Sequence, residues 1–513
     1  MNRKLLHFSI YSFFAISSFS CFSQDWNQII KAVASDRADT AAFGYDVAIS
    51  ENFAVVGLEF NAYDESGLNY IFSSGAAYVF ENVSGVWTQI QKIVPSDRTI
   101  GAGFGQSVDI FNDYIIVGQQ KDFGAVYVFK NNSGSWVQSQ KITPLNSTTH
   151  NSFGTSLAIN NDNIIIGQYL DSKDENEINS LAGSGSAYFY SNVSGTWELT
   201  QKVVASTRHE NDYFGKKVDI SGDVAIIGAP MNGFDELNSN FLSSAGAGYI
   251  FKKTNGIWQE IEIIVASDRS EHESFTSSVA IDGGNIVVGI FRDVDNFTYT
   301  NTLNAAGAAY VFKENAGLWV QTQKIISTDA EDGDLFGFDV AIDGNNILIG
   351  ARHEDPNSSM DSGSAYTFKN VSGAWIQTQK LNASDIYTDE NFGFSVAIDG
   401  GFSIIGAPYD AKNELGVNPL WISGSVYFFE SLSAGISNLS IQNSTVFGYK
   451  NTVSIKIEKV IDARINIIDI LGNSVCKQDI IDSETAINLN LPTGIYIVEL
   501  TNNGIVETKK VFV

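Results

Sequence analysis

The feature that most constrains this chain is a tryptophan followed at a constant distance by a phenylalanine, a pair that recurs seven times. The two residues are always 17 positions apart, whereas the step from one copy to the next varies, so insertions fall at one place in each copy. A period in this range indicates a repeat architecture, in which similar small units pack side by side. The pairs are Trp26 and Phe43, Trp87 and Phe104, Trp136 and Phe153, Trp197 and Phe214, Trp258 and Phe275, Trp319 and Phe336, and Trp375 and Phe392.

Each copy predicts four short strands. The first alternates between apolar and polar residues, as at 395–398, and the second is a continuous apolar run that suits a strand buried on both faces, as at 347–349. The third and fourth correspond to residues 76–80 and 87–92 of another copy. Asp-Gly, Ser-Gly and Asn-Gly pairs separate the first strand from the second and the third from the fourth, which predicts tight hairpins.

These units predict an all-β chain whose seven four-stranded antiparallel sheets form a seven-bladed β-propeller. Nothing in the repeat region has a helical period. The seventh copy lacks a fourth strand, because Ile436 stands where its tryptophan would fall. The strand that begins at Trp26, in contrast, is a fourth strand with no first three strands before it. We therefore expect the amino-terminal strand to pair beside Tyr427 and to close the ring, which removes an exposed sheet edge.

The repeat resembles the FG-GAP repeat of integrin α-subunit propellers and of many secreted bacterial proteins. The resemblance lies in Phe-Gly openings such as Phe43-Gly44 and in the Gly-Ala-Pro closings at 228–230 and 406–408, and it covers about residues 24–430. The fifth copy departs from it with Phe275-Thr276. Integrin-like repeats hold calcium in Asp-x-Asp-x-Asp-Gly loops, but the corresponding hairpins here are too short, so that calcium assignment does not carry over.

The amino-terminal residues predict a secretory signal peptide at 1–23, with basic residues before an apolar stretch and small residues before Gln24. A membrane anchor and a lipidated Cys21 are the alternatives. No other segment is apolar enough to span a bilayer, so we expect no transmembrane segment after the signal is removed. Signal removal leaves Cys476 as the single cysteine, which excludes an intramolecular disulfide.

Composition changes after the last repeat, which predicts a linker at 431–436 and a separate domain at 437–513. Short alternating runs, such as 465–470 and 506–513, predict a small β-sandwich. Through the turn at 469–472, the Pro-x-Gly-Ile-Tyr segment and the terminal Lys-Lys strand, it resembles the carboxy-terminal sorting domain of the type IX secretion system of Bacteroidetes-type bacteria. The resemblance implies engagement of the secretion machinery, export, and release or attachment at the outer-membrane surface. An accessory sandwich without a targeting role is the alternative.

The connections between second and third strands, such as 58–75, and those between copies, such as 94–103, fall on one face of the propeller, which we call the loop face. These loops hold every long insertion and many of the acidic residues behind the net charge of −27, which argues against nucleic acid and for a basic partner or cations. Calcium is the ion that such loops would hold, although no EF-hand spacing occurs. Acidic loops that only keep the protein soluble are the alternative. Our candidate ligand-binding residues are Asp64, Asp171, Asp174, Asp235, Asp293, Asp295, Asp355, Asp410 and Trp421.

We therefore expect a secreted or surface-attached binding or adhesion protein that recognises an extracellular glycan or protein and is not an enzyme. One alternative is a carbohydrate-active enzyme, a polysaccharide lyase or hydrolase, because histidines occur beside acidic residues on the loop face. These histidines are His150, His209, His272 and His353. The sequence contains no nucleophile elbow, zinc spacing or phosphate loop. A purely structural surface component is the other alternative.

Overall fold

The computed structural model describes most of the repeat region and much of the carboxy-terminal region. The chain divides into two compact units, Met1–Leu432 and Ser433–Val513, which are treated separately below. The predicted signal peptide and residues 432–436 of the predicted linker lie outside the described residues. No helix within the described ranges has the length and apolarity needed to cross a membrane. The described residues are 26–145, 152–293, 303–417, 419–431, 445–449, 452–456, 460–461, 463–468, 474–488, 495–502 and 505–512.

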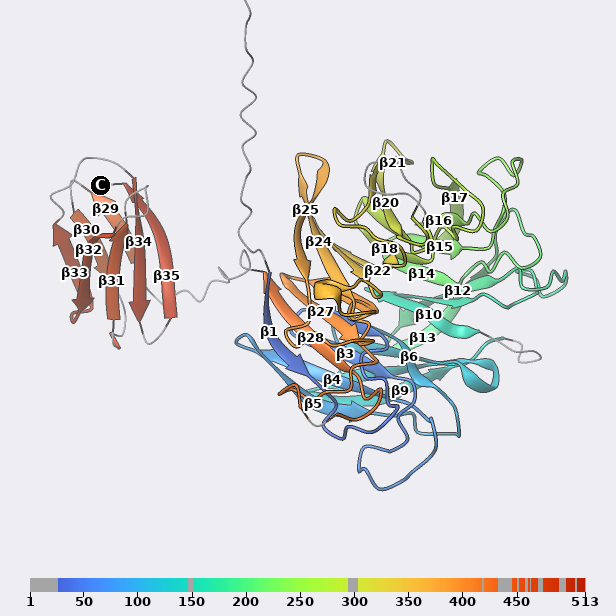
Figure 1. The fold of residues 1–513 in the computed structure, drawn as a ribbon, viewed down its shortest axis with the longest axis horizontal. Coiled ribbons are helices and arrows are strands. Elements are labelled where there is room, and N and C mark those ends of the chain that lie inside the picture. The colour runs from blue at the N-terminus through green and yellow to red at the C-terminus, as the bar shows by residue number, and fades with distance from the viewer. Residues whose placement is uncertain are drawn as a thin grey trace, which may run out of the picture. The chain divides into compact units, whose positions relative to one another are not determined.

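The region that contains the seven repeats consists of seven four-stranded antiparallel sheets, which confirms the predicted fold (Figure 1). The first sheet contains β2 (Val47–Ser50), β3 (Phe53–Leu58), β4 (Ala76–Val83) and β5 (Val86–Ile93). The second contains β6 (Phe104–Phe111), β7 (Tyr114–Gln119), β8 (Ala125–Asn132) and β9 (Ser135–Ile142). The third contains β10 (Phe153–Asn160), β11 (Asn163–Gln168), β12 (Ser186–Val193) and β13 (Thr196–Val203). The fourth contains β14 (Lys217–Ser221), β15 (Val224–Ala229), β16 (Ala247–Thr254) and β17 (Ile257–Ile264).

The remaining sheets follow the same order. The fifth contains β18 (Ser278–Asp282), β19 (Asn285–Ile290), β20 (Ala308–Asn315) and β21 (Leu318–Ile325). The sixth contains β22 (Phe336–Asp343), β23 (Asn346–Ala351), β24 (Ser364–Val371) and β25 (Ala374–Leu381). The seventh contains β26 (Ser395–Asp399), β27 (Phe402–Ala407), β28 (Ser425–Ser431) and the amino-terminal strand β1 (Trp26–Ala32). Two single-turn 3₁₀ helices, η1 (Lys121–Phe123) and η2 (Pro356–Ser358), lie in connections.

The amino-terminal strand lies where the sequence predicted it. β1 pairs antiparallel with β28, with Trp26 opposite Ser431 and Lys31 opposite Tyr427. The seventh sheet also packs against the first, because Trp87 stacks on Phe428 with a centroid distance of 4.8 Å. Each of the seven sheets therefore has a neighbour on both sides.

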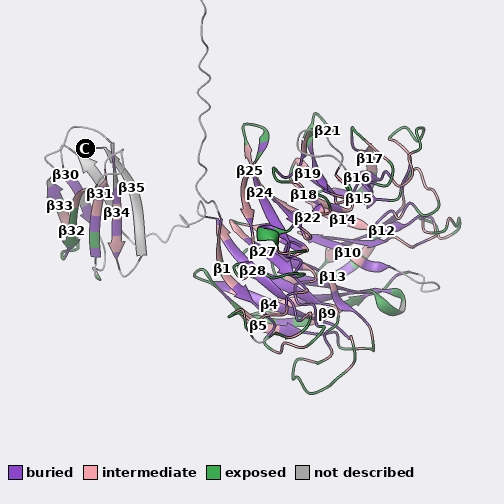
Figure 2. Ribbon diagram, viewed as in Figure 1, coloured by how far each residue is buried: buried purple, intermediate pink, exposed green. Residues whose placement is uncertain are grey.

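Aromatic packing between neighbouring sheets explains why the repeat retains its tryptophans. The ring of Trp136 contacts that of Phe53 in the preceding sheet with a centroid distance of 5.4 Å, and Trp258 stacks on Phe189 with a centroid distance of 4.1 Å. All seven tryptophans of the repeat are buried, and Figure 2 shows the strands mostly buried and many of the connecting loops exposed. These tryptophans therefore serve packing between blades.

The glycines of the repeat are required by contact between sheets. A side chain at Gly57, which closes a second strand, would place its Cβ 2.0 Å from the carbonyl oxygen of Gly105 in the next sheet. Gly105 has a φ of +92°, which an L-residue adopts only with strain. The two glycines thus press together where neighbouring blades meet, which accounts for the Phe-Gly opening and the glycine that closes the second strand.

The carboxy-terminal unit is a two-sheet β structure, as predicted. Its three-stranded sheet contains β29 (Thr445–Tyr449), β30 (Thr452–Lys456) and β33 (Glu484–Asn488). Its four-stranded sheet contains β32 (Ser474–Ile480), β31 (Ala463–Ile468), β34 (Ile495–Asn502) and β35 (Ile505–Phe512). Val453, Ile465, Ile467, Val498 and Leu500 contribute to one buried core. The predicted turn at Leu471-Gly472-Asn473 lies outside the described residues.

Candidate binding face and central channel

Three of the predicted ligand-binding aspartates are buried in internal ion pairs. Asp171, Asp293 and Asp410 occupy equivalent positions, four residues after the glycine that closes the second strand. Asp293 Oδ2 lies 2.8 Å from Lys324 Nζ, and Asp410 Oδ2 lies 2.6 Å from Lys31 Nζ. Asp171 Oδ2 lies 2.8 Å from Lys202 Nζ. Each lysine belongs to the outermost strand of the same sheet, so these carboxylates hold the loop to the blade and turn away from solvent.

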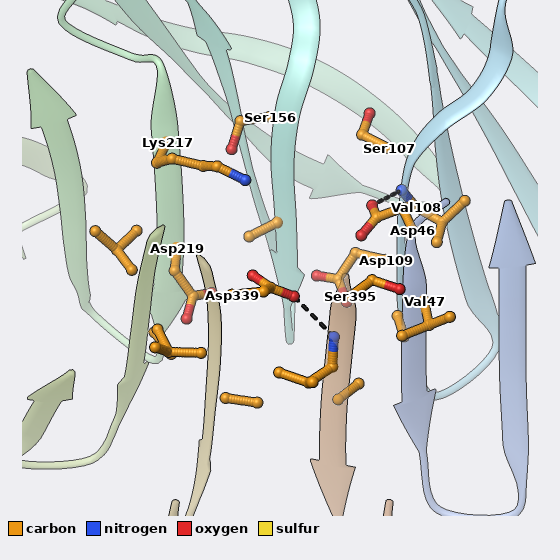
Figure 3. A pocket seen from close by; sticks show the side chains of 18 of the residues that line it. Asp46, Val47, Ser107, Val108, Asp109, Ser156, Lys217, Asp219, Asp339 and Ser395 are labelled. Carbon is orange, nitrogen blue, oxygen red and sulfur yellow. Dashed lines mark hydrogen bonds between the residues drawn. The ribbon is translucent and has the colours of Figure 1, made fainter. Parts of the chain in front are cut away.

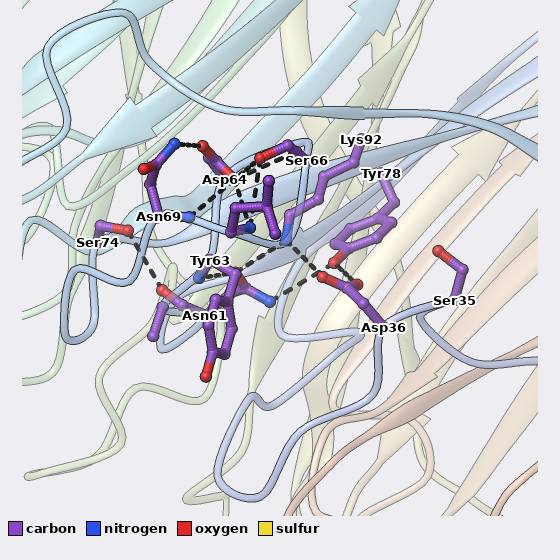
Figure 4. A network of polar contacts seen from close by, with 12 residues as sticks. Ser35, Asp36, Asn61, Tyr63, Asp64, Ser66, Asn69, Ser74, Tyr78 and Lys92 are labelled. Atoms are coloured by element: carbon purple, nitrogen blue, oxygen red, sulfur yellow. Dashed lines mark hydrogen bonds and ion pairs between the residues drawn. The ribbon is translucent and has the colours of Figure 1, made fainter.

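The same lysine also contacts a second acid, in most cases one from the loop that precedes the sheet. Lys324 Nζ lies 2.8 Å from Asp268 as well, and Lys31 Nζ lies 2.6 Å from Asp385. In the first sheet Lys92 contacts Asp36, and the Tyr78 hydroxyl donates to the same carboxylate (Figure 4). A buried ammonium thus stands between the acidic groups that would otherwise coordinate a cation.

The described part of the chain shows no cluster of ligating side chains for the calcium ion that the sequence analysis considered. No group of three or more His, Cys, Asp or Glu side chains is placed there to hold a metal ion. The carboxylates of the loop face that come closest together are paired with lysine, as at Lys380 with Asp329 and Glu354. Lysine supplies the positive charge that calcium supplies in loops with closely spaced aspartates.

Asp64, Asp174 and Asp235 serve a different purpose, because each organises its own loop. Asp174 Oδ1 accepts hydrogen bonds from the backbone N–H groups of Asn176 and Ile178, at 3.1 and 2.8 Å. Asp64 accepts from the corresponding backbone N–H groups in the first sheet (Figure 4). It also accepts from the side chains of Asn69 and Ser66, and these side-chain hydrogen bonds are the main cause of a pKa far below the usual range. Asp235 does the same for the loop of the fourth sheet. The aspartates make these loops rigid.

The remaining candidates differ in exposure. Asp355 is exposed and accepts a hydrogen bond from the backbone N–H of Asp361 at 2.7 Å. Trp421 is 70% exposed, and its backbone N–H donates to Asp39. Asp295 lies outside the described residues. Trp421 is thus the predicted residue whose side chain is most available to a partner.

A feature that we did not predict is a set of apolar side chains at the tips of four rigid loops. Leu68, Ile178, Leu237 and Leu415 are 81%, 73%, 77% and 82% exposed. They come from the first, third, fourth and seventh sheets, always between the second and third strands, and so lie on the loop face. The sequence signal is a leucine or isoleucine two or four residues after the Asp or Asn that organises the loop. Exposed apolar residues rimmed by acids are typical of interaction surfaces.

A second unpredicted feature is a channel of about 600 Å³ lined by the innermost strand of every sheet. Alternate residues of these strands face the channel, which places Asp46, Asp109, Asp219 and Asp339 around a common space with Lys217 (Figure 3). The sequence signal was present, since each of these residues replaces a small residue at the same register position in other copies.

The channel carboxylates connect neighbouring blades. Asp46 Oδ2 accepts a hydrogen bond from the backbone N–H of Val108 in the next sheet at 2.7 Å, and Asp109 Oδ2 accepts from Ile159 at 2.7 Å. Asp219 accepts from Ile281 in the same way. These side chains border the channel, but protein atoms surround the carboxylates and reduce their hydration. This burial raises the pKa of Asp46 and Asp219 to about 7 and that of Asp109 to about 8.

We expect the Asp109→Asn substitution to weaken the pH dependence of stability. An ordinary aspartate has a pKa of about 3.9, so between about pH 4 and pH 8 native Asp109 keeps a proton that the unfolded chain has lost. The free energy of unfolding therefore falls as pH rises through this window, and asparagine removes that contribution while Oδ1 can still accept from Ile159. Urea unfolding at pH 5, 6, 7 and 8 measures the slope. Asp113→Asn, at an exposed turn of the same sheet, is the control, and equal slopes for both variants would contradict the prediction.

Comparison with known proteins identifies both units. The FG-GAP repeat model matches residues 26–80, 87–129, 136–190, 197–251, 258–312, 319–368 and 375–429. The secretion system C-terminal sorting domain model matches residues 449–513. No curated protein sequence matches the chain.

Three solved structures align with this chain at low sequence identity. A chain of a mitotic checkpoint complex aligns with a TM-score of 0.46 and 11% identity, covering 84% of this chain and 99% of that one. PorZ, described as an essential surface component of the type IX secretion system of Porphyromonas gingivalis, aligns with a TM-score of 0.43 and 12% identity. That alignment covers 93% of this chain and 60% of PorZ. Sqt1 of Saccharomyces cerevisiae aligns with a TM-score of 0.41 and 9% identity, over 80% of this chain and 100% of that one.

Proposed function

This chain belongs to the FG-GAP repeat family and ends in a type IX sorting domain, and from that premise we propose that it is a non-catalytic binding protein of the extracellular space or the cell surface. The sorting domain indicates export by the type IX system, followed by release or surface attachment. Binding takes place on the loop face, where the propeller meets an extracellular macromolecule.

The observation that carries this proposal is the set of exposed apolar tips on loops that are held rigid. A side chain such as Leu68 or Leu415, more than four-fifths exposed, gains free energy only when a partner covers it. The loops beneath are organised by their own aspartate or, under Leu415, by Asn413, so little conformational entropy is lost on binding. Exposed acids beside the tips, such as Glu65 and Glu414, supply a polar rim that favours a basic surface on the partner.

The arrangement of the histidines supports a non-catalytic role. His209 Nδ1 lies 3.2 Å from Asp212 Oδ2, and the His209 ring stacks on Phe234. In a loop of another blade, His353 Nδ1 lies 3.7 Å from Asp361 Oδ1. His209 and His353 thus interact with acids of two different blades, and His150 lies outside the described residues. The acid and the base of an enzyme that cleaves glycans would instead flank the same glycosidic bond.

The test replaces the four exposed apolar side chains in one variant. We expect the quadruple variant Leu68→Ser, Ile178→Ser, Leu237→Ser and Leu415→Ser to lose binding by about tenfold or more, because each covered leucine contributes roughly 1.5–3 kcal/mol. The probes are an array of extracellular polysaccharides and an array of extracellular matrix proteins, read by biolayer interferometry. Thermal unfolding should change little, since the four side chains are exposed in the free protein.

A matched control exists on the opposite face. Val83, Val86, Ile257 and Leu318 are 60%, 59%, 55% and 61% exposed at hairpins between the third and fourth strands. Serine at these four positions removes a similar apolar area and should leave binding unchanged. Loss of binding in this control with retention in the loop-face variant would assign the function to the other face.

A further inference from the structure

The opening of the channel on the loop face has two chemically different sides. Seven equivalent positions, each two residues after the repeat phenylalanine, line this end of the channel. They are aromatic in three consecutive blades and polar in the other four. The residues are Tyr45, Gln106, Thr155, Lys216, Ser277, Phe338 and Phe394.

This variation shows that the seven positions do not serve packing of the repeat. Positions that pack blades together, such as the tryptophans and the tyrosines, keep the same residue in all seven copies. At the channel opening the copies differ although the backbone repeats. Side chains released from a common packing role are available for recognition of a ligand.

The aromatic side forms a continuous arc. Phe394 contacts Tyr45 at a centroid distance of 5.1 Å and Phe338 at 5.1 Å. Phe291 continues the arc beside Phe338 at 5.6 Å, and Tyr409 lies 6.0 Å from Phe394. The five residues are partly exposed, and Tyr45, Phe291, Phe338 and Phe394 line the channel.

Arg352 adds a guanidinium to this arc. Its Cζ lies 4.2 Å from the ring centre of Phe338 and 5.4 Å from that of Phe394. Its hydrogen bond to Asn391 Oδ1 is long, at 3.5 Å, and its Nε has no hydrogen-bond partner among the described residues. No carboxylate of the described chain forms an ion pair with it. In a protein of net charge −27, this arginine retains donors for an incoming oxygen atom.

The opposite side carries further polar groups. Gln106 Oε1 is buried at the wall and accepts no hydrogen bond within the described residues. Lys216 Nζ lies 3.8 Å from the ring centre of Tyr169, and burial lowers the pKa of this lysine to about 8. The opening therefore combines an aromatic wall with hydrogen-bonding groups across from it.

We propose that the channel mouth binds one neutral sugar ring of an extracellular glycan. This inference rests on the proposed function of the loop face and names the class of its partner. A pyranose presents an apolar face of C–H groups and a rim of hydroxyls, and this pair of surfaces matches the aromatic arc and the polar side. Arg352 donates to ring or hydroxyl oxygens, and Gln106 and Lys216 meet the opposite rim.

The test uses substitutions that other blades already carry. Arg352→Gln introduces the residue found at the equivalent position of the second copy, Gln120, and Phe394→Thr introduces that of the third copy, Thr155. Both variants should therefore fold. The probes are hexasaccharides of glucose, mannose, galactose and N-acetylglucosamine, with galacturonate hexasaccharide as an acidic probe, measured by saturation-transfer NMR and calorimetry with the full mature chain.

We expect at least one neutral probe to bind, and each substitution to weaken it by about tenfold or more, as for loss of a charged hydrogen bond or a stacking face. Phe111→Leu, at the other end of the channel, should leave sugar binding unchanged. Arg352→Lys should restore part of the affinity by keeping the charge. Failure of all neutral probes to bind, binding of the galacturonate probe alone, or binding by both mouth variants as tight as by the wild-type protein would overturn the inference. Matrix-protein binding that still depends on the loop tips would leave the proposed function intact.

Discussion

Replacing Lys324 with methionine is expected to lower the free energy of unfolding by about 3–5 kcal/mol, the usual cost of removing one partner from a buried ion pair. Lys324 Nζ lies 2.8 Å from both Asp268 and Asp293, and the Asp293 side chain has no exposed surface. Glu273 adds a third acid, whose pKa is raised to about 7 by burial and by the charge of Asp293. Without the ammonium, these acids repel one another in a site with little water.

The fourth blade provides the matched control, because it carries neutral residues at three positions of the same cluster. Where the fifth blade has Lys324, Asp268 and Asp293, the fourth has Ile263, Thr207 and Asn232. There the Tyr249 hydroxyl lies 3.1 Å from Thr207 Oγ1 and accepts a hydrogen bond from Asn232 Nδ2 at 2.9 Å. The chain itself thus shows that the position accepts neutral groups when all three change together.

We therefore expect the triple variant Lys324→Ile, Asp268→Thr and Asp293→Asn to recover most of the stability that Lys324→Met loses. Replacing a whole buried charge cluster by neutral groups is often close to neutral in free energy, whereas removing one member is costly. Urea unfolding at neutral pH measures both variants. A chelator should not change the melting temperature of the wild-type protein, since lysine occupies the centre of the cluster. A triple variant as unstable as the single one, or a large chelator shift, would refute this account.

The strands, their number per blade and the position of the amino-terminal strand were predictable because the repeat forces the same residues to do the same task seven times. Trp87 and Gly57 occupy contacts between blades, and tryptophan and glycine stand at these two positions in all seven copies, so their spacing reports the geometry directly. The carboxy-terminal strands were predictable from simple alternation. Such signals depend on the identity and spacing of residues that are near in sequence.

The role of the loop acids was not predictable in the same way. Asp293 and Lys324 are 31 positions apart, and Asp410 pairs with Lys31 from the opposite end of the chain. A carboxylate in a variable loop looks available to a ligand until its partner from the outer strand is placed beside it. The channel residues were missed for a related reason, because alternation alone does not reveal which side of the first strand faces the central axis. Comparison of Asp109 with the alanines at the same register would have indicated it.

Deletion of the amino-terminal strand, residues 26–32, is expected to have the largest effect of any change considered for this protein. The deletion removes Trp26, which is 3% exposed, and large-to-small changes at such a residue alone cost about 3–5 kcal/mol. It also removes Lys31 from between Asp385 and Asp410, which leaves two paired acids without their ammonium. Together these losses approach the entire stability of a typical domain, about 5–15 kcal/mol.

The position of β1 explains why the effect should spread beyond one blade. Gln379 of the sixth sheet donates its side-chain N–H to the Trp26 carbonyl at 2.9 Å and accepts the Trp26 backbone N–H at 2.9 Å. Equivalent glutamines join other neighbouring blades, as Gln91 does with Trp136. Without β1, the sixth sheet loses this connection and β28 becomes an open edge strand, which favours aggregation.

Addition of the missing strand as a synthetic peptide distinguishes a specific role from general damage. A peptide of residues 24–33 should restore the melting transition of the deleted protein in a concentration-dependent way, because it binds the folded state and not the unfolded one. The same peptide with Trp26 and Lys31 replaced by alanine is the control and should restore little. If the deleted protein melts like the intact chain, or if both peptides act equally, β1 does not hold the first and last parts of the repeat region together. Rescue by the native peptide alone would show that the seventh blade needs a strand supplied from the other end of the chain.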